Sequence, residues 1–114
     1  MITREGRADV RTYIKTNYVY YQLGTGGDST NPNATDLDSP IGVRGSVTPI
    51  ESSESTIEWK FTILGSDFLG QTIKEVGIFD ATSTGNMLVR VNYEGVGPLK
   101  STDEIEFVIV VEVD

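Results

Sequence analysis

Apolar and polar residues alternate in several segments after residue 17, and this period of two predicts β-strands. The clearest case is residues 57–63. Successive side chains of a strand point to opposite faces, so this segment separates four large apolar residues from three polar ones. The two sets are Ile57, Trp59, Phe61 and Ile63 against Glu58, Lys60 and Thr62. We therefore expect a strand with one face in a core and the other in water.

Residues 73–91, IKEVGIFDATSTGNMLVRV, predict an antiparallel hairpin. Two apolar segments with strand character flank the polar turn ATSTGN. Gly85 and Asn86 tolerate the positive φ that tight turns need, and the side chains of Asp80 and Ser83 can hydrogen-bond to the turn backbone.

Residues 18–23, YVYYQL, favour a strand that ends at Gly24. Tyr18 and Tyr20 point to one face of this strand and Tyr21 points to the other. Because large side chains occupy both faces, we expect the strand to be covered on both sides.

The alternation in residues 105–113 predicts a final strand. One face of this strand is entirely apolar and carries Ile105, Phe107, Ile109, Val111 and Val113. Its second face carries Val108 and Val110 between Glu106 and Glu112. Such a strand is either central in a two-layer fold or covered by a partner. Together with the tyrosine strand it supplies the candidate oligomer or partner contacts, Tyr18, Tyr20, Tyr21, Val108 and Val110.

The remaining elements follow weaker patterns. Residues 3–16 have partial helical spacing of apolar residues and predict one short helix. Residues 43–51 alternate like one strand, with Pro49 at a strand end, bulge or edge because it cannot donate to a ladder. Phe68 and Leu69 interrupt a polar stretch, and we expect both to close one end of the core.

These elements predict an all-β fold. The expected architecture is an antiparallel β-sandwich or flattened barrel of about six to eight strands with one short N-terminal helix. A chain of 114 residues is the size of one domain, so we expect residues 1–114 to form a single β-sandwich domain. Residues 24–40, rich in Gly, Asp, Asn, Ser, Thr and Pro, predict a long surface loop.

Charge and composition narrow the range of functions. Seventeen acidic residues against nine basic ones give a net charge of -8, which repels nucleic acid. The absence of cysteine and histidine excludes disulfides, thiolate and imidazole metal ligands, and catalysis by histidine. No segment approaches the ~18 apolar residues of a membrane span, and the charged N-terminus lacks the apolar region of a secretory signal. We expect neither nucleic acid nor membrane as a partner.

The loop 24–40 gathers possible oxygen ligands for a metal, namely Asp28, Asp36 and Asp38 together with Asn31 and Asn33. Their oxygens are of the kind that calcium prefers, but their spacing is not that of an EF-hand. The alternative is that these side chains form Asx turns that hold the loop. No spacing marks a catalytic pair among the carboxylates, so we predict no metal, no cofactor and no enzymatic activity.

Three pieces of sequence occur in an order that resembles a known family. They are LGTG at 23–26 with the polar loop after it, IKEVGIFDA at 73–81, and GNMLVRV at 85–91. In this respect the chain is similar to the tail-collar and head-fibre type of small structural protein found in tailed bacteriophages and archaeal viruses.

The resemblance implies a non-enzymatic virion structural protein that is made in the host cytoplasm. It implies a homo-oligomer, with a trimer favoured, and other virion proteins as partners. The implied location is the tail, the baseplate, a fibre attachment or the capsid surface, where the protein would be a decoration. No long fibrous segment follows the β domain in this sequence, which favours a connector or decoration over a receptor-binding protein.

A second hypothesis stays open beside it. The acidic loop and the tyrosines are also compatible with a calcium-binding or carbohydrate-binding β-sandwich module.

Overall fold

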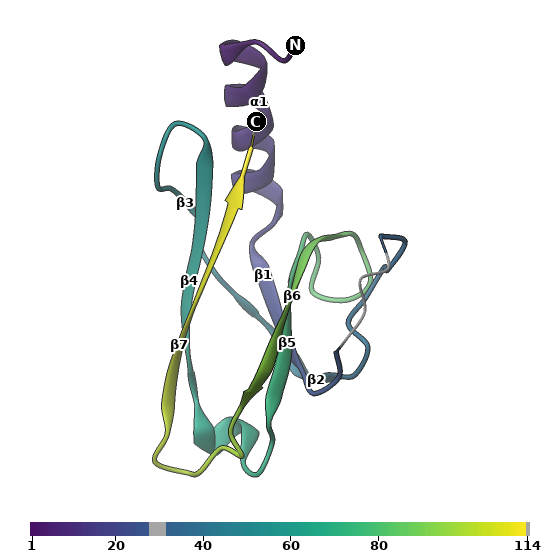
Figure 1. The fold of residues 1–114 in the computed structure, drawn as a ribbon, viewed down its shortest axis with the longest axis vertical. Helices are drawn as coiled ribbons and strands as arrows, with labels where there is room; N and C mark the ends of the chain where they lie inside the picture. Colours follow the sequence, from purple (N-terminus) through teal and green to yellow (C-terminus); the bar gives the residue numbers. More distant parts are fainter. Residues whose placement is uncertain (28–31, 114) are drawn as a thin grey trace.

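Two antiparallel sheets pack face to face in the computed structural model, which describes residues 1–27 and 32–113 (Figure 1). Seven strands are present in these residues, so the predicted all-β sandwich with one N-terminal helix is confirmed. The first sheet has the strand order β2-β1-β5-β6 and the second has the order β3-β4-β7. The elements are α1 (Arg4–Asn17), β1 (Tyr20–Gly24), β2 (Pro40–Ser46), β3 (Ile50–Glu51), β4 (Thr56–Leu64), the 3-10 turn η1 (Gly65–Phe68), β5 (Ile73–Phe79), β6 (Met87–Val96) and β7 (Glu104–Glu112).

The core lies between the two sheets. The second sheet contributes the apolar face of β4 that the alternation predicts, and Ile57 and Trp59 of that face are fully buried. The first sheet contributes Leu23, Val76 and Ile78, all at most 1% exposed. The buried indole of Trp59 donates a hydrogen bond from Nε1 to the carbonyl oxygen of Tyr18 at 2.8 Å, so its one polar atom is satisfied.

Helix α1 begins after Thr3, whose Oγ1 accepts a hydrogen bond from the Gly6 N–H at 3.0 Å, as an N-cap does. It lies one residue later at each end than the predicted range 3–16. Tyr18 is the C-cap of this helix rather than the first residue of a strand, which corrects the prediction for residues 18–23. In Figure 1 the helix stands at one end of the sandwich, beyond the first sheet and beside the hairpin formed by β3 and β4. Among the described residues, no helix has the length and apolar character needed to cross a membrane.

Ion pairs connect α1 to the β3–β4 hairpin. Arg11 Nε and Lys15 Nζ each lie 3.4 Å from Glu51 Oε1, and Arg4 Nε lies 2.7 Å from Glu54 Oε1. The basic residues at positions 4, 11 and 15 recur at the spacing of one helix face, so α1 meets the acidic hairpin with a basic stripe.

Residues 43–51 do not form one strand, contrary to the prediction. β2 ends at Ser46 in the first sheet, and β3 begins at Ile50 in the second. Pro49, which has no N–H to donate, is buried in the crossing between them. The segment therefore changes sheets at the residue type that cannot continue a ladder.

The hairpin prediction for residues 73–91 is confirmed, since β5 and β6 pair antiparallel. Gly85 has φ +70°, and one carboxylate oxygen of Asp80 accepts from the Asn86 N–H at 2.7 Å. At the other end of the sandwich Phe68 packs against the core, but Leu69 is 63% exposed. The expectation that both residues close the core is therefore wrong for Leu69.

Candidate functional site

The outer face of the first sheet carries a polar network built around a buried carboxylate. Glu75 of β5 has no exposed surface. Its Oε2 accepts hydrogen bonds from the N–H groups of Gly26 at 3.0 Å and Ser39 at 2.8 Å, and its Oε1 accepts one from Asp38 at 2.8 Å. One side chain thus binds the backbone at both ends of the segment between β1 and β2. We call this arrangement the Glu75 staple.

Two glycines of the LGTG segment make room for the staple. Gly24 pairs with Glu75 across the β1–β5 ladder, and a Cβ on Gly24 would come within 2.5 Å of the carboxyl group. A Cβ on Gly26 would lie 2.9 Å from Glu75 Oε2. Side chains at these positions would displace the carboxylate. The LGTG and IKEVGIFDA pieces of the sequence are therefore connected by one physical contact.

A small apolar cluster lies beside the staple. Leu37, from the segment before β2, is 5% exposed, and Phe79 of β5 is fully buried. Both approach Gly77, where a Cβ would lie 2.7 Å from the Phe79 ring and 3.0 Å from Leu37. The described part of the predicted loop is thus packed down on the sheet, and Pro40 at its end already belongs to β2.

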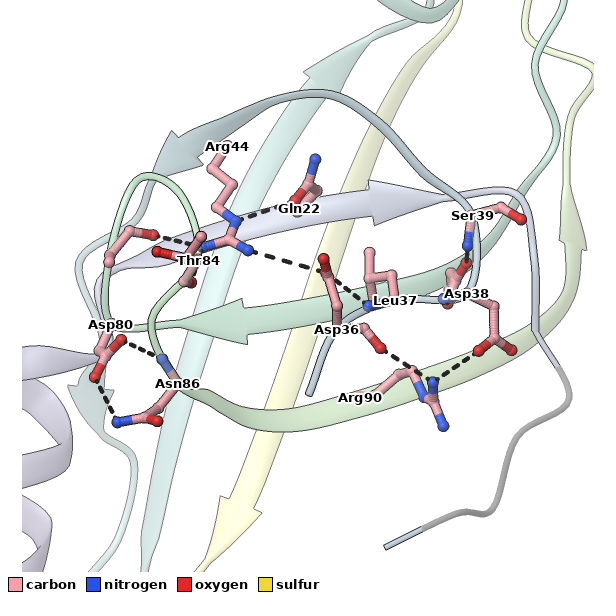
Figure 2. A network of polar contacts seen from close by, with 12 residues as sticks. Gln22, Asp36, Leu37, Asp38, Ser39, Arg44, Asp80, Thr84, Asn86 and Arg90 are labelled. Carbon is pink, nitrogen blue, oxygen red and sulfur yellow. Dashed lines mark hydrogen bonds and ion pairs between the residues drawn. The ribbon is translucent and has the colours of Figure 1, made fainter. Parts of the chain in front are cut away.

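Arg44 of β2 covers this cluster and holds the β5–β6 turn (Figure 2). Its guanidinium carbon lies 3.6 Å from the centre of the Phe79 ring, a cation–π contact. Its Nε donates to Gln22 Oε1 at 3.0 Å, and one terminal nitrogen donates to the carbonyl oxygens of Ala81 and Thr84 at 2.8 and 2.7 Å. Only 5% of the Arg44 side chain is exposed, so these partners replace water around the charge.

The aspartates proposed as metal ligands lie against arginines. The Arg44 guanidinium is 3.9 Å from Asp36 Oδ1, and that same oxygen accepts from the Leu37 N–H at 2.7 Å. Arg90 of β6 donates to Asp38 Oδ1 and to the Asp36 carbonyl oxygen, both at 3.3 Å (Figure 2). Asp36 and Asp38 therefore hold the loop in place, which was the alternative to metal binding for these acidic residues.

The third candidate aspartate, Asp28, lies outside the described residues, as does Asn31. Within residues 1–27 and 32–113, no three acidic side chains gather closely enough to hold a metal ion. Every fully buried side-chain nitrogen or oxygen in this part of the chain has a hydrogen-bond partner. The buried polar atoms of the network are thus hydrogen-bonded within the chain, and these bonds attach the segment between β1 and β2 to the sheet.

A shallow depression of about 330 Å³ lies next to Arg44. Residues of β2 and of the β5–β6 turn line it, among them Val43, Thr82 and Thr84. Its lining includes no aromatic ring on which a sugar could stack.

The tyrosines proposed as partner contacts differ in their surroundings. Tyr21 faces inward and stacks on Phe61 with ring centres 3.8 Å apart, and Tyr18 packs against the same core. Burial raises the pKa of both hydroxyls above the ordinary value near 10, with a nearby carboxylate adding to the shift in each case. Tyr20 lies half-buried on the opposite face of β1.

The two proposed valines lie on the outer face of the second sheet. Val108 is 45% exposed and Val110 is 56% exposed. β7 is an edge strand, paired with β4 alone among the described strands. Of the two predicted alternatives the central position is therefore wrong, and cover by a partner stays a prediction. These valines are the most accessible of the five residues proposed for partner contact.

Glu75, Arg44 and Arg90 were not predicted from the sequence as parts of a site. For Glu75 a signal exists, because it is a charged residue within a strand that is apolar on both faces. A charge in such a strand must be paired or bonded when the strand is buried. For the two arginines no local pattern points to their partners. Arg44 is 37 positions from Ala81 in the sequence, and Arg90 is 52 positions from Asp38.

The fold and this network define a small β-sandwich whose loops are bound by internal polar contacts. Neither the known protein-family models nor the curated protein sequences contain a match to this chain. The similarity to tail-collar and head-fibre proteins therefore remains a hypothesis based on the three sequence pieces.

Proposed function

We propose that this protein is a non-enzymatic structural component of a tailed-virus particle, acting as a tail, baseplate or fibre-attachment part or as a capsid surface decoration. Its task in this proposal is to bind other virion proteins, and copies of itself, through β-domain surfaces. The sequence resemblance motivates the viral assignment.

One observation of the structure carries the assembly role. The edge strand β7 exposes Val108 and Val110 on the outer face of the second sheet. An exposed apolar strand edge is a surface suited to protein contact.

Mass spectrometry of purified virus particles tests the proposal. We expect the protein in washed particles at a fixed copy number, with small multiples of three or six for a tail part and hundreds for a decoration. Absence from particles that retain their other tail and capsid proteins would refute the assignment.

Self-association is tested separately by analytical ultracentrifugation across a wide concentration range. A trimer is the expected species. A monomer at all concentrations would remove the homo-oligomer and leave only contacts with other proteins.

A further inference from the structure

β7 is an edge strand of the second sheet and pairs with β4 alone among the described strands. β7 pairs with β4 over nine consecutive positions without a shift in register. At the two ends of this ladder the Val113 N–H bonds to the Ser55 carbonyl, and the Gly65 N–H bonds to the Asp103 carbonyl. Hydrogen-bonded and non-bonded pairs alternate in an antiparallel ladder, so the odd-numbered residues of β7 bond to β4. The even-numbered residues direct their N–H and C=O groups away from it.

The same even-numbered residues present their side chains on the outer face of the sheet. In order along the strand they are Glu104, Glu106, Val108, Val110 and Glu112. Over residues 104–110 the edge thus combines backbone groups that point away from β4 with two glutamates followed by two valines. No lysine, proline or bulge occurs in β7. Its edge charges are all glutamates, which oppose an acidic strand but attract a basic one.

A second copy of β7 is a poor occupant of this edge. With the even-numbered residues facing each other, three antiparallel registers pair a valine of one copy with a valine of the other. The first pairs Val108 with Val108 and places Glu104 opposite Glu112, and the second pairs Val108 with Val110 and places Glu106 opposite Glu112. The third pairs Val110 with Val110 and places each Val108 opposite a charged Glu112, so only one apolar pair forms. By two-fold symmetry each like-charge pair occurs twice, and directly opposed like charges destabilise a sheet. The net charge of -8 on each copy adds to this repulsion.

We propose that β7 accepts an added antiparallel strand from a different protein, and that this strand is basic where it faces Glu104 and Glu106 and apolar where it faces Val108 and Val110. Strand addition of this kind takes its affinity from backbone hydrogen bonds and its selectivity from alternate side chains. On its inner side the added strand covers Ile105 and Val111, which are only partly buried. The inference relies on the proposed function only for where the partner is found, namely in the same particle.

A nine-residue peptide tests the inference directly. Acetyl-KVVTVTKVK-amide places Lys opposite Glu104, Glu106 and Glu112 and Val opposite Val108 and Val110 when it pairs antiparallel. Two control peptides accompany it. EVVTVTEVE reverses the charges, and KVVTPTKVK keeps them but breaks the backbone ladder with a central proline. Fluorescence anisotropy of labelled peptides gives the dissociation constants.

Hydrogen exchange and two protein variants locate the binding. We expect saturable binding of KVVTVTKVK only, with slowed amide exchange at Glu106, Val108 and Val110. Glu106→Lys turns an attraction into a repulsion and is expected to weaken binding about tenfold, since cross-strand charge pairs contribute up to ~1 kcal/mol each way. Glu94→Lys on β6 makes the same change of net charge and serves as the matched control.

Each other result overturns the inference. Absence of binding, equal binding of the acidic or the proline peptide, equal loss of affinity in both variants, or protection at other amides would each exclude this strand partner. A dimer that protects the same amides without peptide would assign the edge to a second copy. None of these outcomes bears on the presence of the protein in particles, so a failure here is distinct from a failure of the proposed function.

Discussion

Replacement of Glu75 by Gln is the most direct test of how the outer face is held together. The substitution keeps the shape of the side chain but removes the charge and replaces one acceptor oxygen by an NH2 group. Glu75 accepts three backbone N–H bonds, two at Oε2 and one at Oε1. The less costly orientation of the amide places its nitrogen at the Oε1 position, opposite the Asp38 N–H, so that two donors face each other.

The free-energy cost follows from these contacts. A buried donor left without a partner costs about 1–3 kcal/mol. The two remaining bonds, to Gly26 and Ser39, become neutral, and charge-assisted hydrogen bonds are roughly twice as strong as neutral ones. We expect a total loss of about 3 kcal/mol in the free energy of unfolding. For a domain of this size that corresponds to a fall in Tm of roughly 12 °C.

Urea denaturation and native-state hydrogen exchange measure the effect. The variant should unfold at lower urea with an unchanged slope, and the amides of Gly26, Asp38 and Ser39 should exchange faster. Glu94→Gln, at an exposed position of β6, is the matched control and should change stability by less than about 0.5 kcal/mol. A Glu75→Gln protein as stable as the control, with these three amides still protected, would refute the staple.

Gly24→Ala supplies a second approach to the same contact. Its Cβ would displace the Glu75 carboxyl group, so each substitution should destabilise the protein alone, and the two together should cost less than their sum. Additive losses would mean that Gly24 is required for another reason.

Three further predictions concern the rest of the fold. Arg44→Lys should lower the free energy of unfolding by about 2 kcal/mol in urea denaturation, because an ammonium cannot stack on Phe79 and bond the turn carbonyls together; a change below about 0.5 kcal/mol would contradict this role. Glu51→Gln removes two ion pairs of α1 and should cost about 1 kcal/mol at low salt and less at 1 M NaCl, whereas Glu58→Gln should show no salt-dependent loss. Burial raises the pKa of the Tyr21 hydroxyl in the folded protein, so its contribution to stability is complete below the ordinary pKa near 10 and is lost as pH rises through the raised pKa. Thermal unfolding from pH 8 to 11 should show this decline, and Tyr21→Phe should reduce it; an alkaline decline of equal size in both proteins would assign it to other groups.

Local patterns predicted the strands that have one buried and one exposed face. The alternation in residues 57–63 depends only on the geometry of a strand, and the β5–β6 turn depends on residues that tolerate positive φ, so both were predicted correctly. The same reasoning failed for residues 43–51, where an alternating segment is divided between two sheets. Side-chain period does not report which neighbour a strand pairs with, and that choice separates β2 from β3.

The tyrosine strand shows a second limit of local reasoning. We predicted cover on both faces of β1, but the pattern does not tell a strand's own second sheet from another protein, and Tyr20 on the outer face is only half-buried. The position of Tyr21 against Phe61 shows that the cover on that side is the core of the same chain. In the final strand, β7, no described part of the same chain covers the outer valines. Val108 and Val110 are exposed on an edge strand of the second sheet.

The sequence by itself determined the class of fold, the sites of the turns and the lack of cysteine and histidine chemistry, because these follow from residue types and from spacings of a few residues. Only the tertiary structure decided that the acidic loop is bound to Glu75, Arg44 and Arg90, and that β7 lies at an edge. The contacts of Glu75 and Arg90 with this loop join residues 36 to 54 positions apart, and their energies depend on burial that exists only once the sheet has formed. The sequence near a carboxylate, a valine pair or an arginine does not say which distant residue it will contact. The packing of the two sheets determines that partner.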